Sequence, residues 1–83
     1  MSRVDDAINL IGETLQIQER TADFTAETPL FGFIPELDSM AVVSIITAME
    51  EQYGFIVEDD EINAETFENI GALAGFIEQK LSA

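Results

Sequence analysis

The sequence predicts a small all-α bundle, with three main helices, one short helix and a long loop between the first two helices. Apolar residues recur at spacings of three and four along three segments, which is the period of one helix face. The chain has 83 residues, enough for one modest core, so residues 1–83 are expected to form a single domain. A hydrophobic content of 47% is sufficient for folding, so the acidity of the chain does not indicate disorder.

The first helix is predicted over residues 2 to about 19. Ser2 is placed to cap its N-terminus, and two aspartates in the first turn favour the positive end of a helix. One face carries four apolar residues: Val4, Ile8, Ile11 and Leu15. Leu10 and Ile17 lie off that face and are expected to pack under the following loop.

The loop is predicted over residues 20–37, where Gly and both prolines of the chain interrupt any regular pattern. It nevertheless carries six large apolar residues: Phe24, Leu30, Phe31, Phe33, Ile34 and Leu37. A loop with this much apolar surface is not a free linker. We expect it to lie across the helices and to bury several of those side chains.

The second helix is predicted from about Ser39 to Tyr53, since Asp38 is a good N-cap and Gly54 a natural stop. At about 100° per residue, one side of it collects Val42, Ile45, Ile46, Met49 and Tyr53. The opposite side holds Met40, Ser44, Thr47 and Glu51, with Val43 at its edge. Because Asp38 takes the capping role, the side chain of Ser39 is expected to remain in solvent.

Residues 55–57 are expected to form an extended, partly buried connection, because no second apolar run is available to pair with them as a strand. The acidic residues 58–61 favour the start of a short helix over about 59–64, anchored by Ile62. This acidic run lacks the residue spacing of a calcium-binding loop, so no specific metal site is predicted.

The last helix is predicted over about residues 69–82, with Asn69 as its cap and Phe67 fixing its entry. Its buried stripe is expected to comprise Ile70, Leu73, Ala74, Ile77 and Leu81. Gly71 and Gly75 lie four residues apart and lower helix propensity, which indicates close approach to another helix or to the loop.

Charge limits the classes of partner. Seventeen acidic residues face three basic ones, Arg3, Arg20 and Lys80, for a formal net charge of −14. Nucleic acids and anionic membranes are excluded because phosphate contacts require clustered Lys and Arg. The expected partner is a protein with a basic surface, and the chain is expected to act as a monomer. No signal peptide is recognisable and no apolar run approaches the roughly 20 residues of a membrane span, so a cytoplasmic location is expected.

Catalysis by the chain itself is not predicted. It contains neither cysteine nor histidine, which removes thiolate nucleophiles and the commonest general base. No glycine-rich phosphate-binding motif is present. A serine such as Ser39 would therefore have to be modified by another enzyme, since its activation needs a base that this chain does not contain.

The exposed side of the second helix offers a mildly apolar strip beside Ser39. It can be read as ordinary surface scatter, since single exposed apolar residues are normal. The excess of acids and the position of Ser39 favour a partner-docking face instead. The residues assigned to this face are Met40, Ala41, Val43, Ser44, Thr47, Glu50 and Glu51.

The segment Leu37-Asp38-Ser39-Met40, followed by an apolar helix ending at Gly54, resembles the Asp-Ser-Leu/Met motif of acyl carrier proteins. Two later segments agree with that family, Ile56-Val57-Glu58-Asp59-Asp60 and Phe67-Glu68-Asn69-Ile70-Gly71-Ala72-Leu73. The resemblance covers essentially the whole chain and implies a small four-helix acyl-carrier-like bundle.

The resemblance implies a non-catalytic carrier. A phosphopantetheinyl transferase would attach 4′-phosphopantetheine from coenzyme A to the hydroxyl of Ser39, with Asp38 as part of the motif. The thiol of that arm would carry acyl groups as thioesters to enzymes with basic docking surfaces. An acyl chain can fold back between the helices in this family, and the residues expected near such a cavity are Val42, Ile46, Tyr53, Ile62 and Leu73.

The sequence departs from the pattern of housekeeping fatty-acid carriers near Ser39. Those carriers usually have acids where Ala41 and Ser44 stand here, and Gly-Ala where Glu36-Leu37 stand. These departures favour a specialised pathway, such as the synthesis of a polyketide, a nonribosomal peptide, or a modified lipid or polysaccharide. Two alternatives stay open: an aminoacyl or peptidyl carrier, and an unmodified acidic adaptor in which Ser39 is only a capping residue.

Overall fold

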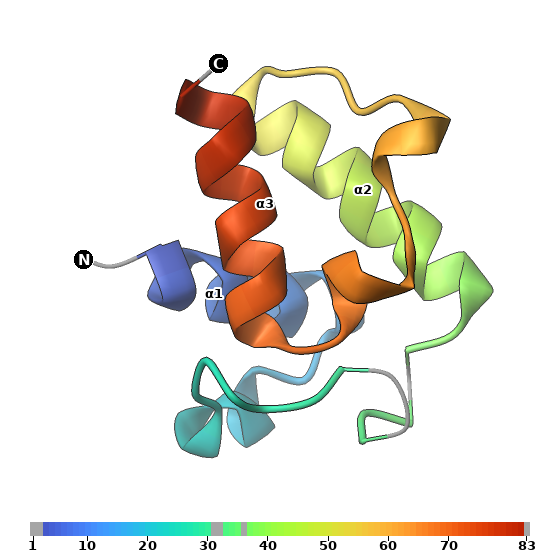
Figure 1. The fold of residues 1–83 in the computed structure, drawn as a ribbon. Helices are drawn as coiled ribbons and strands as arrows, with labels where there is room; N and C mark the ends of the chain where they lie inside the picture. Colours follow the sequence, from blue (N-terminus) through green and yellow to red (C-terminus); the bar gives the residue numbers. More distant parts are fainter. Residues whose placement is uncertain (1–2, 31–32, 36, 83) are drawn as a thin grey trace.

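The computed structural model describes residues 3–30, 33–35 and 37–82. Its α-helices are α1 (Arg3–Leu15), α2 (Ser39–Tyr53) and α3 (Ile70–Ser82). In Figure 1, α3 passes in front of α1, α2 lies to one side of α3, and the segment joining α1 to α2 runs along one end of the bundle. The predicted all-α class is confirmed, because every helix or strand assigned within the described residues is helical.

The core lies between the three α-helices and the long connection. All of its large members come from the predicted apolar positions or their neighbours: Leu10, Ile11, Ile17, Leu30, Ile34, Leu37, Ile45, Met49, Phe67, Ile70, Leu73 and Ile77. Leu10 and Ile17, expected under the loop, are both buried, whereas Val4, Ile8 and Leu15 are only partly buried. The buried face of α1 is therefore rotated toward Ala7 and Leu10 from the face predicted, because the connection covers that side.

The first helix ends earlier than predicted, at Leu15 instead of about residue 19. Gln16 has a φ of 58°, and the N–H of Ile17 donates to the carbonyl of Gly12 at 2.9 Å. This is the left-handed C-terminal cap, here formed at a glutamine. It turns Ile17 into the core, and the 3-10 helix η1 (Gln18–Asp23) follows. The predicted cap Ser2 lies outside the described residues.

The long connection is attached to the start of α3 by backbone hydrogen bonds. The N–H of Leu30 donates to the carbonyl of Glu68 at 3.2 Å, and the N–H of Gly71 donates to Ala26 at 2.8 Å. Between them, Ile70 donates to Thr28 at 3.0 Å. Leu30, Ile34 and Leu37 are buried as expected. Phe33 is 57% exposed, and Phe31 lies outside the described residues.

The short helix predicted over residues 59–64 is replaced by two 3-10 turns, η2 (Asp59–Glu61) and η3 (Ala64–Phe67). Two side chains explain the break. The Glu61 carboxylate accepts from the N–H of Glu58 at 2.9 Å and closes η2, while the Asn63 side chain accepts from the first backbone N–H groups of η3. Ile62 lies between the two turns and is half-buried against the core.

The two glycines of α3 behave differently. A Cβ at Gly71 would lie 3.0 Å from the carbonyl oxygen of Ala26, so the predicted close approach to the loop is confirmed there. A Cβ at Gly75 would meet nothing within 4 Å of the described structure, so the same prediction is wrong for Gly75. Asn69 caps α3 as predicted, accepting from the N–H of Ala72 at 2.7 Å.

Candidate functional site

The start of α2 places Ser39 on the surface as the first helical residue. Asp38 precedes it in an extended conformation, and its carboxylate accepts from the N–H of Ala41 at 2.9 Å. The Asp38 carbonyl also accepts from the N–H of Val42 at 3.0 Å. The predicted N-cap at Asp38 is therefore confirmed, and the exposed side chain of Ser39 takes no part in capping.

The chain on either side of Ser39 is anchored in the core. Leu37 is 7% exposed and its N–H donates to the carbonyl of Ile34 at 3.0 Å. Within α2, Ala41 is 8% exposed and Ile45 is fully buried. An exposed hydroxyl held between two buried anchors is accessible to another enzyme and yet fixed in position.

The first turn of α2 also provides free backbone donors. The first N–H groups of any helix have no intrahelical partner. The Asp38 side chain satisfies one of them, the N–H of Ala41, whereas the N–H groups of Ser39 and Met40 have no partner among the described residues. The helix dipole adds a partial positive charge at this end. An anionic group bonded to the Ser39 hydroxyl would be favoured at this position.

The docking face predicted beside Ser39 is largely exposed. Met40 and Val43 are 74% and 57% exposed, and Ser44, Thr47 and Glu51 are exposed as well. The prediction that Ala41 belongs to the docking face is wrong. Its methyl group is buried in the same core cluster as Leu37 and offers little surface to a partner. Glu50 is half-buried, and its carboxylate accepts from the N–H of Val57 at 2.8 Å.

The comparisons with known proteins bear on this site. The family model described as the phosphopantetheine attachment site matches residues 5–77. The chain belongs to this family. A solved structure of a holo acyl carrier protein from Nitrosomonas europaea, determined by NMR in solution, is similar over 100% of both chains, with 52% sequence identity and a TM-score of 0.91. No curated protein matches the chain.

Family membership defines the class of molecule. The protein is an acyl carrier, which is non-catalytic and bears a covalent 4′-phosphopantetheine arm. Acyl carrier proteins work with a phosphopantetheinyl transferase and with enzymes that handle acyl groups. The α2 N-terminus suits such an arm, since it offers an exposed hydroxyl and free N–H groups for a phosphodiester.

The five residues predicted near an acyl cavity lie around the core of this carrier. Leu73 is fully buried, and the other four, Val42, Ile46, Tyr53 and Ile62, are partly buried. None of the five lines either of two surface hollows found among the described residues. One hollow lies under the long connection and the other lies between η3 and α3.

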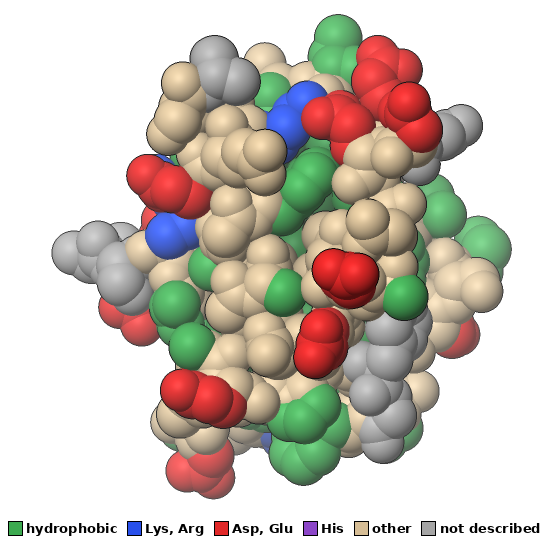
Figure 2. All heavy atoms as spheres, in the orientation of Figure 1, with side chains coloured by type: hydrophobic (Ala, Val, Ile, Leu, Met, Phe, Trp, Pro, Cys, Tyr) green, Lys and Arg blue, Asp and Glu red, His purple; other side chains and the backbone are tan. Residues whose placement is uncertain are grey.

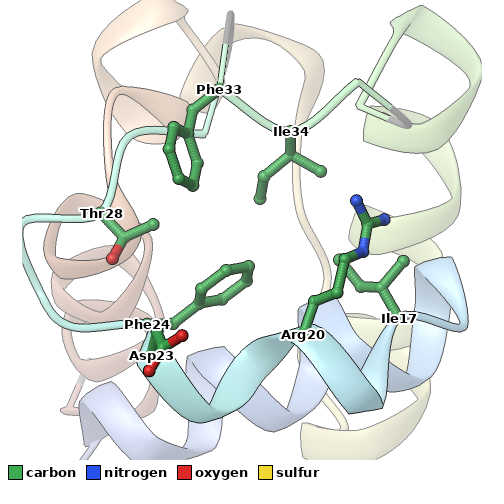
Figure 3. Close-up of a pocket in the computed structure, with 7 residues that line it drawn as sticks. All are labelled: Ile17, Arg20, Asp23, Phe24, Thr28, Phe33 and Ile34. Atoms are coloured by element: carbon green, nitrogen blue, oxygen red, sulfur yellow. The ribbon is translucent and has the colours of Figure 1, made fainter.

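Sequence reasoning missed the hollow under the connection. The sequence identifies Phe24, Phe33 and Ile34 as apolar loop residues and predicts that Ile17 packs under the loop, and all four line this hollow (Figure 3). Nothing in their spacing indicates that Arg20 and Thr28 border the same space, because the turn at Gln16 and the 3-10 helix η1 bring them together. The density of aromatic residues in the loop was the available signal.

Two of the three basic side chains, Arg3 and Lys80, lie near the C-terminal end of α2. Arg3 contacts Glu78 at 2.7 Å and Asp6 at 2.9 Å, and its guanidinium lies 5.9 Å from the Tyr53 ring centroid. Lys80 contacts Glu61 at 2.8 Å and lies 5.8 Å from the Phe55 ring centroid. Figure 2 shows acidic side chains spread over the surface, with basic ones confined to small areas.

Three groups at this end have shifted pKa values. The pKa of Glu61 is lowered, first by the hydrogen bond from the Glu58 backbone and then by Lys80. Burial raises the pKa of Tyr53, the charge of Asp6 adds to that rise, and the charge of Arg3 opposes it. The Tyr53 hydroxyl is buried without a hydrogen-bond partner among the described residues. Arg3 has a raised pKa, chiefly because of its hydrogen bond to Glu78.

The described residues contain neither a membrane-spanning helix nor a metal-binding cluster. Within the described residues, no helix has the length and apolar character needed to cross a membrane. The same part of the chain holds no group of three acidic side chains arranged to bind a metal ion.

Proposed function

We propose that the phosphopantetheine arm is attached at Ser39 and that the protein is a discrete carrier of acyl groups in a specialised biosynthetic pathway. One observation supports the position above all others. Ser39 is exposed at the first residue of α2, while Asp38 already supplies the cap that a serine at this junction would otherwise provide.

Loading is a phosphoryl transfer. The Ser39 Oγ attacks the phosphorus of coenzyme A that bears pantetheine, the diphosphate P–O bond breaks, and adenosine 3′,5′-bisphosphate leaves with the bonding electrons. The proton of the hydroxyl passes to a base of the transferase, because this chain contains no histidine and a serine needs a base for activation. The N–H groups of Ser39 and Met40 then face the new phosphodiester.

The arm provides the thiol that carries the acyl group as a thioester. The chain has no cysteine, so no side-chain thiol competes for the acyl group. The arm keeps its cargo close to each enzyme that the carrier docks with, which raises the effective concentration of that cargo.

The docking face consists of Met40 and Val43 with the polar residues Ser44, Thr47 and Glu51 around them. An exposed apolar centre with an acidic surround suits a partner that has an apolar pocket and a basic rim. Ala41 and Ser44 stand where housekeeping fatty-acid carriers usually have acids, so we assign the partners to a specialised pathway. A cytoplasmic, monomeric carrier is part of this proposal.

Intact mass measures the attachment. The protein is incubated with coenzyme A, Mg²⁺ and a promiscuous phosphopantetheinyl transferase, and wild type is expected to gain the mass of one phosphopantetheine. Ser39→Ala is expected to gain nothing. Ser82→Ala is the matched control, since Ser82 is an exposed serine at the end of α3, outside the docking face, and its removal should leave loading unchanged. An addition that survives Ser39→Ala would sink the assignment.

The aminoacyl or peptidyl carrier is the second candidate, because it uses the same fold and the same arm. Family membership disfavours the unmodified adaptor, since the matched model describes an attachment site. Incubating the holo protein with acyl-loading enzymes and with adenylating enzymes separates the two kinds of cargo. Loading by the adenylating enzymes alone would favour the aminoacyl carrier.

A further inference from the structure

Met40 is the most exposed large apolar side chain in the part of the molecule that the structure describes, at 74%. It directly follows Ser39 in the first turn of α2. Val43, which is 57% exposed, stands three residues further on and so on the same face of the helix. The thioether of Met40 therefore lies in open solvent, next to the serine proposed to bear the arm.

A second methionine of α2 provides an internal comparison. Met49 is fully buried in the core cluster that also holds Ile45 and Ile77. Oxidation of the Met49 sulfur requires the core to open, whereas the side chain of Met40 can be oxidised in the folded protein. Met1, the third methionine of the chain, lies outside the described residues. One helix thus carries one methionine open to oxidants and one that the fold protects.

The composition of the chain directs a neutral oxidant to Met40. The chain has no cysteine, so no side-chain thiol competes for the oxidant before the arm is attached. A net charge of −14 repels anionic oxidants, whereas uncharged hydrogen peroxide approaches freely. The thioether sulfur attacks one peroxide oxygen, the O–O bond breaks, and the departing hydroxide takes the proton of the transferred oxygen. The products are methionine sulfoxide and water.

Oxidation changes the docking face and leaves the fold contacts around Ser39 in place. The sulfoxide puts a strongly polar S=O group at the apolar centre of that face. A partner pocket that accepts an apolar side chain offers no donor to this oxygen, so docking would leave it unpaired. The Asp38 cap on the N–H of Ala41 and the buried anchors Leu37 and Ile45 do not depend on the Met40 sulfur.

We propose that Met40 is a modification site, whose reversible oxidation by a hydroperoxide lowers the affinity of the carrier for the enzymes that act on Ser39. The proposal rests on the carrier function proposed above and adds regulation of the same site. A methionine sulfoxide reductase restores the thioether: two thiols are oxidised to a disulfide, and the sulfoxide oxygen leaves as water. Docking is then regained without new synthesis of the protein.

The first test measures where oxygen is added. The apo protein is treated with hydrogen peroxide and desalted, and intact mass and peptide fragmentation locate each added oxygen. We expect oxygen at Met40 to appear at least about tenfold faster than at Met49. The Tm of the protein oxidised at Met40 should stay within about 3 °C of the untreated value, because the change is confined to the surface. Equal rates at the two methionines would overturn the proposal.

The second test measures docking. Initial rates of phosphopantetheine addition by the transferase are recorded over a range of concentrations of untreated and oxidised carrier. The KM for oxidised carrier should be roughly fivefold to a hundredfold higher, which corresponds to one unpaired polar group in an apolar pocket. The kcat should be unchanged, since Ser39 and its surroundings are intact. Methionine sulfoxide reductase should restore the original KM, and a KM unaffected by peroxide would refute the regulatory role.

Met40→Leu is the decisive variant, because leucine keeps an apolar side chain of similar volume but has no sulfur. Compared with its own untreated form, this variant should show no change in KM after peroxide. Met49→Leu is the matched control from the same helix, and it should still gain oxygen at Met40 and show the rise in KM. A rise in KM in Met40→Leu as large as in wild type would assign the effect to another group and overturn the proposal.

Failure of this proposal is distinguishable from failure of the attachment proposal. If untreated wild type gains no phosphopantetheine, attachment at Ser39 fails and the regulatory proposal falls with it. If untreated and oxidised carrier are both loaded with the same KM, attachment at Ser39 stands and regulation through Met40 is overturned.

Discussion

The two ends of α2 differ in how they are held. At its N-terminus, the cap at Asp38 is formed within the local chain, and the residues that follow it on the outer face are exposed. At its C-terminus, Tyr53 lies beside Arg3, which also bonds Glu78 of α3. Glu50 accepts from Val57 there, and Tyr53 stacks on Phe55 with centroids 5.9 Å apart.

The contacts that stabilise the fold and the groups proposed to serve function therefore lie at opposite ends of α2. The long-range ion pairs of the described residues bring Arg3 to Glu78 and Lys80 to Glu61, toward the C-terminal end of α2. At the N-terminal end of α2, the Ser39 side chain and the side chains of Met40 and Val43 are exposed to solvent, and the first N–H groups of the helix are free to bind a ligand. In Figure 1 that end points away from the C-terminus of the chain. We therefore expect modification or docking at one end to leave the contacts at the other end unchanged.

The largest effect is expected at Gly54, which ends α2 with a φ of 76°. Gly54→Ala should destabilise the protein by about 1–2 kcal/mol, because an alanine is strained in the left-handed region. Gly75→Ala is the control, since a Cβ there meets nothing within 4 Å and should stabilise the helix by about 0.5–1 kcal/mol. Urea denaturation measures both, and equal signs for the two variants would contradict the prediction.

At the opposite end of α2, Asp38→Ala should lower the free energy of unfolding by about 1 kcal/mol, because the N–H of Ala41 loses its acceptor. Asp38→Asn should be close to wild type in stability, since asparagine caps about as well. Hydrogen exchange should show faster exchange only in the first turn of α2. Faster exchange around Tyr53 would show that the two ends are coupled.

A smaller effect is expected from the Glu61 carboxylate. Folding lowers the pKa of this carboxyl below its ordinary value of 4.5. The ionised carboxylate therefore stabilises the folded protein at pH values above 4.5. The contribution is lost as the pH falls through the lowered pKa. Thermal melts from pH 6 down to about pH 3 should show a shallower loss of Tm in Glu61→Gln than in wild type. Glu51→Gln, in the exposed part of α2, should follow wild type, and identical curves for all three proteins would refute the prediction.

The smallest effect concerns Tyr53, the only tyrosine of the chain. Burial places its pKa above the usual 10.0, so phenolate absorbance should appear at higher pH than in the unfolded protein. Stability is correspondingly lost as the pH rises from the unfolded value through the folded one. Arg3→Gln should raise the pKa further, because Arg3 lowers it. Arg20→Gln is the control, and a lower pKa in Arg3→Gln would be incompatible with this account.

Local patterns predicted the elements well where propensity and capping agreed. Asp38 and Asn69 are caps, Gly54 ends α2, and the apolar spacing of α3 matches its buried face apart from Leu81, which is 39% exposed. The end of α1 could not be predicted, because Gln16 is no signal for a left-handed turn. That turn depends on burying Ile17, which is a tertiary interaction.

The candidate site was predicted only in part. The exposure of Ser39 and of most neighbouring docking-face residues follows from the helix phase. Ala41 was wrongly assigned to the docking face, because it is buried in the core. The hollow under the connection depends on which loop residues face one another in space. Phe24 and Phe33 are nine residues apart in an irregular segment, where no period applies.

The hydrogen bonds between the long connection and α3 have a consequence for the order in which the molecule forms. Ala26, Thr28 and Leu30 bond to residues 68–71, which are synthesised about forty residues later. A nascent chain that ends within α2 already contains Ser39 but lacks the α3 residues to which Ala26, Thr28 and Leu30 bond. Because these bonds tie the connection before Ser39 to the last helix, we expect chains that lack α3 to present Ser39 in a less ordered setting.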